Sequence, residues 1–307
     1  MVKRVVIIAD EVEFTEIFYA LEIADGEFEI VRLHGPGELR NWNGIPIEGI
    51  DKIGEIMDLE YDFILIVSIK QDDISSILKR FVPEEKIWSY KMFIDHYLDE
   101  EKRMMCLRER IRRLYPFPQT TQYECGDFSY GRLEVLAGRE QEKLTIGKFC
   151  SVADDVLFLL SAEHKTDYCT TYPFGNLMNE FLIGDCLWSK GDIVVGNDVW
   201  IGNGAKILSG VTIGDGCIIG AGATVAKSIP PYSIVVGNPG RIVKKRFDEE
   251  TIEKMLLMKW WDWSYKDIYH AIPLLLSADT DGLFSYYKEN VDVGGNTDEA
   301  KGGYDFA

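Results

Sequence analysis

Residues 195–240 read VGNDVWIGNGAKILSGVTIGDGCIIGAGATVAKSIPPYSIVVGNPG, and a period of six runs through them. Every sixth position is aliphatic, at Val195, Ile201, Ile207, Ile213, Ile219 and Val225. The positions four residues further on are small or aliphatic as well, at Val199, Ala205, Val211, Cys217, Ala223 and Ile229. A period of six fits neither an amphipathic helix nor one alternating strand, and it is typical of short β segments turning corners in a stacked coil. Because each turn of such a coil buries its apolar face only against its neighbours, we expect the run to fold as one unit.

A second, shorter block of the same period precedes the main one. LTIGKFCSVADDV, at residues 144–156, begins a series in which Ile146, Val152 and Phe158 are six apart. The coil is therefore predicted to start upstream of the main repeat, with an irregular first coil at residues 125–130 and Gly131 to Lys143 as a bulging loop.

Taken together, the repeats and their exit at Ile229-Pro230-Pro231 and Gly237-Asn238-Pro239 resemble the hexapeptide-repeat acyltransferases. That resemblance implies a left-handed parallel β-helix of triangular section. It also favours an enzyme over a non-catalytic coil used for assembly, which stays open as an alternative.

Composition limits the possible partners. The formal net charge of the 307 residues is −18, which argues against nucleic acid or an anionic membrane surface as the main partner. The apolar run from Val5 to Ala9 is interrupted by Asp10 and Glu11, so no export signal is expected. The chain has no apolar run of the about eighteen residues that span a bilayer, and we expect no membrane insertion.

The six cysteines form no C-x-x-C pair, and Cys150 and Cys217 fall at inward positions of the hexads. We interpret them as buried, reduced thiols in a cytoplasmic protein and expect no metal.

The chain is predicted to divide into four segments. Residues 1–118 form a small Rossmann-like α/β domain with a connecting helix, 119–247 a left-handed β-helix with an active-site loop at 159–192, 248–290 C-terminal helices and 291–307 a disordered tail. The first segment alternates strands at Val5–Ala9, Phe28–Leu33 and Phe63–Val67 with helical patterns, which indicates a parallel sheet.

A domain of this kind resembles the nucleotide-sugar-binding domain of some bacterial sugar acetyltransferases. The turn after its first strand reads Ala9-Asp10-Glu11-Val12-Glu13, however, where a pyrophosphate site needs glycine and no carboxylates. Both sugar-nucleotide binding and a role in assembly are therefore kept as hypotheses. The basic stretch from Ile94 to Leu114 is predicted to be one connecting helix.

The two hexad blocks are separated by a long loop that carries His164, the only histidine of the repeat region. The motifs here are, in order, IGKFCSVA, the loop histidine, Thr171-Tyr172-Pro173-Phe174 and NDVWIG. Their order resembles that of the xenobiotic acetyltransferases, a branch that includes streptogramin and type B chloramphenicol acetyltransferases. The resemblance makes His164 the general base. Imidazole suits that task, because its ordinary pKa of about 6.5 lets it accept a proton near neutral pH.

The resemblance further implies acetyl-CoA as donor, a homotrimer, and no covalent intermediate on the nearby Cys169. Carried over by motif position, the cofactor contacts are Trp200, Gly202, Asn203, Ala221, Ala226, Lys227, Arg241 and Lys244. An oxyanion donor is expected at a backbone N–H near Gly202 or Asn203. Asp167 and Tyr172 are candidates for binding the acceptor or orienting His164.

These observations predict an acetyltransferase acting on a hydroxyl or amino group of a small-molecule acceptor. Because of the N-terminal domain, the acceptor is expected to be a nucleotide-linked or surface-polysaccharide sugar. The alternative is O-acetylation of an antibiotic of the chloramphenicol or streptogramin type.

Overall fold

The computed structural model describes residues 2–9, 14–35, 41–42, 45–49, 52, 56, 59–68, 71–115, 122–137, 141–161, 163–177 and 187–291. Within them, no helix is long and apolar enough to cross a membrane. The chain divides into two compact units, Met1–Arg110 and Ile111–Ala307. Several predicted features lie outside the described residues, namely the turn at 10–13, the prolines 116 and 118, and the tail beyond 291.

The first unit is built on a six-stranded sheet in the order β3-β4-β2-β1-β5-β6. Its strands are β1 (Lys3–Ala9), β2 (Phe28–Gly35), β3 (Asn41–Trp42), β4 (Ile45–Gly49), β5 (Phe63–Val67) and β6 (Ile87–Ser89). All neighbours are parallel except β3 and β4. Pro46 lies in β4, which is paired on both sides, and the two-residue β3 forms the edge of the sheet.

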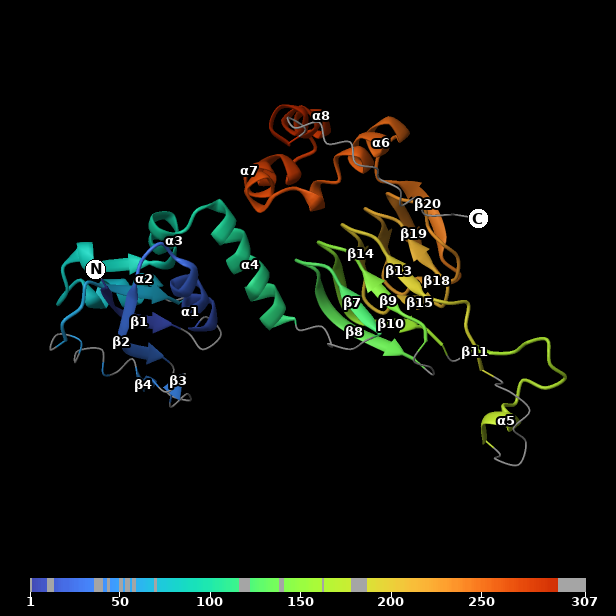
Figure 1. Cartoon of the computed structure of the whole chain (residues 1–307), viewed down its shortest axis with the longest axis horizontal. Helices are drawn as coiled ribbons and strands as arrows, with labels where there is room; N and C mark the ends of the chain where they lie inside the picture. Colours follow the sequence, from blue (N-terminus) through green and yellow to red (C-terminus); the bar gives the residue numbers. More distant parts are fainter. Residues whose placement is uncertain are drawn as a thin grey trace. The chain divides into compact units, whose positions relative to one another are not determined.

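Helices cover both faces of this sheet (Figure 1). They are α1 (Phe14–Ile23), α2 (Gln71–Leu78), α3 (Tyr90–Tyr97) and α4 (Glu100–Leu114). Alternate residues of β1 point to opposite faces of the sheet. Val5 and Ile7 pack with α1, α3 and α4 on one face, whereas Val6 and Ile8 pack with α2 on the other. The unit is thus the predicted α/β sandwich.

The helix predicted from Ile94 to Leu114 is in fact two helices. Leu98 is extended between α3 and α4, and the Oδ1 atom of Asp99 accepts a hydrogen bond from the Lys102 N–H at 2.9 Å. This side-chain cap begins α4 and explains the break, because it satisfies a donor that a continuous helix would have bonded internally.

The second unit contains the predicted coil, whose short parallel strands stack in three faces (Figure 1). Face A consists of β7 (Tyr123–Cys125), β9 (Leu144–Ile146), β13 (Ile193–Val195) and β16 (Thr212–Ile213). Face B consists of the start of β10 (Ser151–Leu159), β14 (Trp200–Ile201), β17 (Ile218–Ile219), β19 (Ser233–Val236) and, antiparallel to it, β20 (Arg241–Lys245). Face C consists of the end of β10, β15 (Lys206–Leu208) and β18 (Thr224–Val225). We call the corners between them edges AB, BC and CA.

The hexad residues fill the coil as predicted. All twelve aliphatic or small positions of the main repeat are buried in one cluster, and Cys150 lies in it as well. The segment from Gly131 was predicted to bulge, but β8 (Tyr130–Leu136) pairs with β10 along faces B and C. It therefore belongs to the first turn of the coil, which was predicted to end at residue 130.

C-terminal helices α6 (Glu249–Met258), α7 (Tyr265–Leu275) and α8 (Thr280–Tyr286) follow the coil. Asp248 caps α6, since its side chain accepts a hydrogen bond from the Thr251 N–H. Pro273 lies inside α7, which runs to Leu275. Stacked Phe128 and Phe149, on edge AB, contact Tyr265 and Trp260, so this segment covers that edge at the first turns of the coil.

Candidate active site

The loop that carries His164 begins and ends at edge CA. It leaves face C after β10 and returns to face A at β13. Three hydrogen bonds fasten its base: Ser189 Oγ donates to the Leu160 carbonyl at 2.6 Å, the Lys190 N–H donates to Ser209 Oγ at 3.0 Å, and the Gly210 N–H donates to the Gly191 carbonyl at 3.0 Å. The loop thus projects from a fixed point on the coil (Figure 1).

His164 lies in a short antiparallel ladder of the loop, formed by β11 (Glu163–His164) and β12 (Leu187–Trp188). Its side chain is exposed, and its Nδ1 atom lies 2.6 Å from the Thr171 carbonyl oxygen. A carbonyl only accepts, so Nδ1 carries the proton of the neutral ring. Nε2 is therefore left with its lone pair, which is the state a general base needs.

The predicted acceptor residues lie on the same loop. Asp167 and Tyr172 are exposed, and the Tyr172 ring lies 4.7 Å from that of Phe174. Asp167 had been a candidate for orienting His164, but the group that bonds Nδ1 is the main-chain carbonyl of Thr171. Sequence reasoning missed that group because every residue has a carbonyl. The pairing of β11 with β12 fixes the position of this carbonyl, and two strands of two residues each have no recognisable sequence pattern.

Edge BC carries four of the predicted cofactor residues: Gly202, Asn203, Ala221 and Arg241. Successive turns approach closely here, since a Cβ atom on Gly202 would lie 2.7 Å from the Ala221 nitrogen. The Asn203 side chain donates to the Asp154 carbonyl at 2.8 Å and to Asp155 Oδ2 at 3.1 Å. The Gly240 N–H donates to the Thr224 carbonyl at 2.8 Å, which brings Arg241 to the same edge. Arg241 and Lys244 are exposed on β20.

Ala226 and Lys227 lie at a different place, on edge CA, where the chain passes from β18 toward face A. Both are exposed. The predicted cofactor residues of one chain therefore fall on two edges of the prism, and the loop of His164 leaves from the edge that carries Lys227.

One part of the proposed oxyanion site does not fit. The Gly202 N–H donates to the Ile219 carbonyl at 2.7 Å within the coil. It is consequently unavailable to a tetrahedral intermediate, and this part of the prediction is wrong.

Trp200 stands in an outward row of face B, with 55% of its side chain exposed. Neighbouring turns pair Tyr130 with Ser151, Ser151 with Trp200, Trp200 with Ile218, and Ile218 with Ile234. A shallow cavity of about 240 Å³ beside Trp200 is also lined by Ser151, Asp198, Ile218 and Arg246. Face B thus carries an outward row that includes Trp200 and Ile218 beside polar groups of the cavity.

Arg246, which follows β20, is held by groups of the coil. Its Nη1 atom donates to Asp198 Oδ2 at 2.9 Å and to the Gly216 carbonyl at 2.8 Å. Burial raises the pKa of Asp198, and the guanidinium opposes that shift. Lys245 donates to the Pro231 carbonyl at 2.9 Å. Both cations therefore secure the exit from the coil.

The thiols differ in their surroundings. Burial raises the pKa of Cys150 to about 12 and that of Cys217 to about 11, so neither is a nucleophile near neutral pH. Cys169 is exposed on the loop. Across the part of the chain that the structure describes, no group of three or more His, Cys, Asp or Glu side chains is placed to hold a metal ion.

Comparisons with known proteins agree with this architecture. The family model "Bacterial transferase hexapeptide (six repeats)" matches residues 192–227. The chain is 44% identical over 161 residues to a probable macrolide acetyltransferase of Lysinibacillus sphaericus, which covers 48% of this chain and 86% of that protein. It is 39% identical over 153 residues to a chloramphenicol acetyltransferase of Klebsiella aerogenes, with 48% and 73% covered. It is 41% identical over 154 residues to a virginiamycin A acetyltransferase of Staphylococcus aureus, with 46% and 67% covered.

Among solved structures, a galactoside acetyltransferase in complex with coenzyme A matches 49% of this chain and 82% of its own, at 22% identity and a TM-score of 0.33. A TM-score this low supports no inference about function.

Proposed function

Because this chain is an acetyltransferase of the hexapeptide-repeat family, related to the xenobiotic branch, we propose that it moves an acetyl group from acetyl-CoA to a hydroxyl group of a small antibiotic-like molecule. The observation that carries the proposal is the identity of 39–44% to three proteins named for macrolide, chloramphenicol and virginiamycin acetylation. These matches span only about half of this chain, and the matched family model lies at residues 192–227.

The proposed reaction is direct transfer. As the acceptor oxygen attacks the thioester carbonyl and a C–O bond forms, Nε2 of His164 takes the hydroxyl proton. The tetrahedral intermediate then breaks its C–S bond, and the imidazolium returns the proton to the departing CoA sulfur. The Thr171 carbonyl supports both steps, because it holds the Nδ1 proton in place and stabilises the imidazolium. Cys169 is not required, since donor and acceptor held together react without an acyl-enzyme.

Acetyl-CoA is proposed to lie along edge BC. Trp200, Gly202, Asn203 and Ala221 would contact its pantetheine arm, while Arg241 and Lys244 would meet its phosphates. The exposure of both cations on β20 supports this part, because neither side chain is buried against the coil. Ala226 and Lys227 lie on edge CA, so they would not contact a cofactor bound along edge BC of the same chain but one bound to a neighbouring copy.

The two-edge arrangement supports a homotrimer. A cofactor on edge BC of one coil would meet His164, Ala226 and Lys227 from edge CA of a neighbouring copy. Two exposed apolar surfaces would be covered in such an assembly. One is the outward row of face B, where Trp200 is exposed and Ile218 is half-buried, and the other is the set of exposed loop side chains, Tyr168, Tyr172, Phe174 and Trp188.

Sugar acetylation remains the second candidate. It is favoured by the presence of the N-terminal α/β unit, and the antibiotic acetyltransferase matches cover only 46–48% of this chain. A sugar acceptor would give that unit a role that antibiotic acetylation does not.

One assay separates the candidates. Purified full-length protein is incubated with acetyl-CoA and a panel of chloramphenicol, a macrolide, virginiamycin A and nucleotide-linked amino sugars, and release of CoA thiol is followed. Acetylation of a panel antibiotic that is lost in His164→Ala supports the main proposal. Transfer to sugars alone would replace it with the second candidate, and thiol release unchanged in His164→Ala would remove the assigned base.

A further inference from the structure

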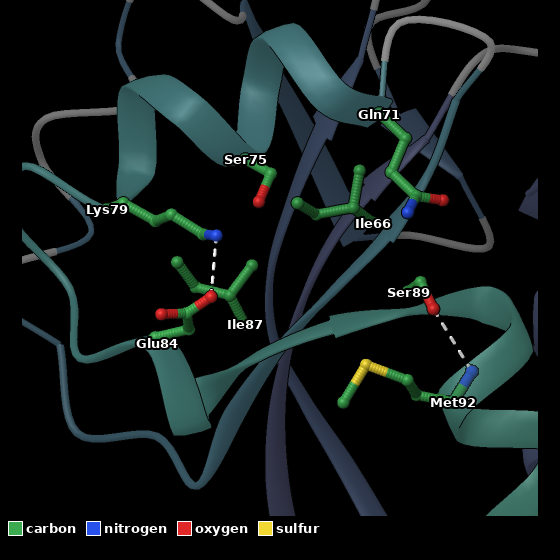
Figure 2. A pocket seen from close by; sticks show the side chains of 8 residues that line it. All are labelled: Ile66, Gln71, Ser75, Lys79, Glu84, Ile87, Ser89 and Met92. Atoms are coloured by element: carbon green, nitrogen blue, oxygen red, sulfur yellow. Dashed lines mark hydrogen bonds and ion pairs between the residues drawn. The ribbon is translucent and has the colours of Figure 1, made fainter.

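The N-terminal unit contains a groove that the proposed reaction does not use. It has a volume of about 220 Å³ and lies between α2 on one side and β6 with the start of α3 on the other (Figure 2). Residues from all of these elements line it: Ile66, Gln71, Ser75, Lys79, Glu84, Ile87, Ser89 and Met92. Ile66 and Ser89 bring it to the carboxyl ends of β5 and β6, which is where open α/β sheets bind ligands.

Regular spacing creates the polar wall of the groove. Gln71, Ser75 and Lys79 are four residues apart, and the Lys79 N–H still donates to the Ser75 carbonyl, so the three side chains share one face of α2 and its last turn. Opposite them, Ser89 Oγ accepts a hydrogen bond from the Met92 N–H at 3.1 Å, which leaves its own O–H able to donate. Apolar contact comes from Ile66, Ile87 and Met92.

The charge in the groove is balanced. Lys79 Nζ and Glu84 Oε1 form an ion pair of 2.6 Å, the only charged pair among the lining residues (Figure 2). Asp72 and Asp73 lie in the first turn of α2, next to Gln71. A bound phosphate would lie near a lysine that is already paired with Glu84 and near the carboxylates of Asp72 and Asp73. The groove therefore suits a neutral ligand.

A neutral ligand for this lining needs many donors and acceptors on a small body with an apolar face. The groove is smaller than the about 300–1,000 Å³ of sites for drug-sized molecules. A pyranose ring meets these demands: its hydroxyl groups both donate and accept, as the amide, the two serines and the ion pair require, and its C–H face packs on aliphatic side chains.

We propose that this groove binds one neutral monosaccharide ring. The site is independent of acetyl transfer, and its occupant is an unphosphorylated sugar rather than the nucleotide portion of a sugar nucleotide. For a ring of this size in an open groove, we expect a dissociation constant on the order of 1 mM.

Saturation-transfer NMR on the full chain tests the proposal, with D-glucose, D-galactose and N-acetyl-D-glucosamine as probes and UDP as a separate arm. Ser75→Phe places a ring in the groove and should weaken sugar binding about tenfold or more. Ser76→Phe is the matched control, because Ser76 is exposed and its Oγ bonds the Asp72 carbonyl of its own helix. Gln71→Ala, which adds no bulk, covers the case in which Ser75→Phe does not fold.

The outcomes separate this site from the acetyl-acceptor site. Binding that is lost in Ser75→Phe or Gln71→Ala and retained in Ser76→Phe and His164→Ala supports the groove, whether or not acetyl transfer takes place. Three results overturn the proposal. They are the absence of a saturation-transfer signal for all three sugars, sugar binding that survives both groove variants, or binding of UDP instead of the sugars.

Discussion

The Nδ1 atom of His164 lies 2.6 Å from the carbonyl oxygen of Thr171, seven residues along the same loop. This hydrogen bond fixes the tautomer of the ring without using a side chain. It is possible because β11 and β12 hold the loop ends together while the chain between them turns back to His164. An acid–base role for the imidazole therefore depends on the shape of the loop as much as on its sequence.

Replacing His164 with alanine should lower kcat by about two to four orders of magnitude, the usual contribution of a general base. Because the side chain is exposed, the melting temperature should stay the same. Thiol release from acetyl-CoA measures the rate, and His270→Ala, an exposed histidine on α7, is the control. A fall in melting temperature that matches the fall in rate would point to a structural role instead.

Tyr172→Phe should raise KM for the acceptor about two- to tenfold, which is the effect of losing one neutral hydrogen bond, while kcat changes little. We expect an effect on KM and not on kcat because the Thr171 carbonyl, not the Tyr172 hydroxyl, orients His164. Tyr168→Phe is the matched control, since its hydroxyl accepts a hydrogen bond from Lys165 on the same loop. Both constants unchanged in Tyr172→Phe would remove this residue from the site.

Arg241→Ala should raise KM for acetyl-CoA about tenfold, as expected for the loss of a charge-assisted contact to phosphate. The comparison that identifies its partner uses acetyl-3′-dephospho-CoA. If Arg241 meets the 3′-phosphate, the variant and the parent protein should have similar KM values for that donor. Lys266→Ala, an exposed cation on α7, controls for net charge. An equal loss with both donors would place Arg241 elsewhere on the cofactor.

Ile218→Asp should dissociate the proposed trimer, because it buries a carboxylate in the outward row of face B. Size-exclusion chromatography with light scattering reports the mass, and activity should fall with it if the site lies between copies. Thr212→Asp introduces the same charge on the outside of face A in the same turn and should leave the mass unchanged. A parent protein that is monomeric at assay concentration contradicts the arrangement.

The sequence predicted the coil well because its period is a direct consequence of the fold. Every hexad position that points inward must be small or aliphatic, so Val195 to Ile229 show the core without any long-range information. The extent of the first turn was missed because Arg132 and Glu134 place charges at outward positions of its strand, β8.

The site was only partly predictable, for a physical reason. His164 has a side chain that identifies it, whereas its partner is a main-chain carbonyl. The distribution of Asn203 and Lys227 over two edges depends on where each strand ends, which pattern alone does not give. One missed feature did carry a signal: Asp99 followed by Glu100 and Glu101 is a helix start, and it marks the break between α3 and α4.

Asp248 provides a prediction about pH. The Thr251 N–H donates to its carboxylate at 2.8 Å, and this hydrogen bond holds the pKa of Asp248 below its ordinary value. Because the folded-state pKa is lower than the unfolded one, the cap stabilises the fold above the unfolded pKa of about 3.9 and is lost as the pH falls through the folded value. Asp248→Asn keeps a capping oxygen that does not titrate. The melting temperature of the parent protein, relative to that of this variant, should therefore stay level at higher pH and fall as the pH drops below the unfolded pKa of about 3.9 toward the lowered folded value. If the melting temperatures of the two proteins differ by the same amount at every pH, protonation of Asp248 does not weaken the cap.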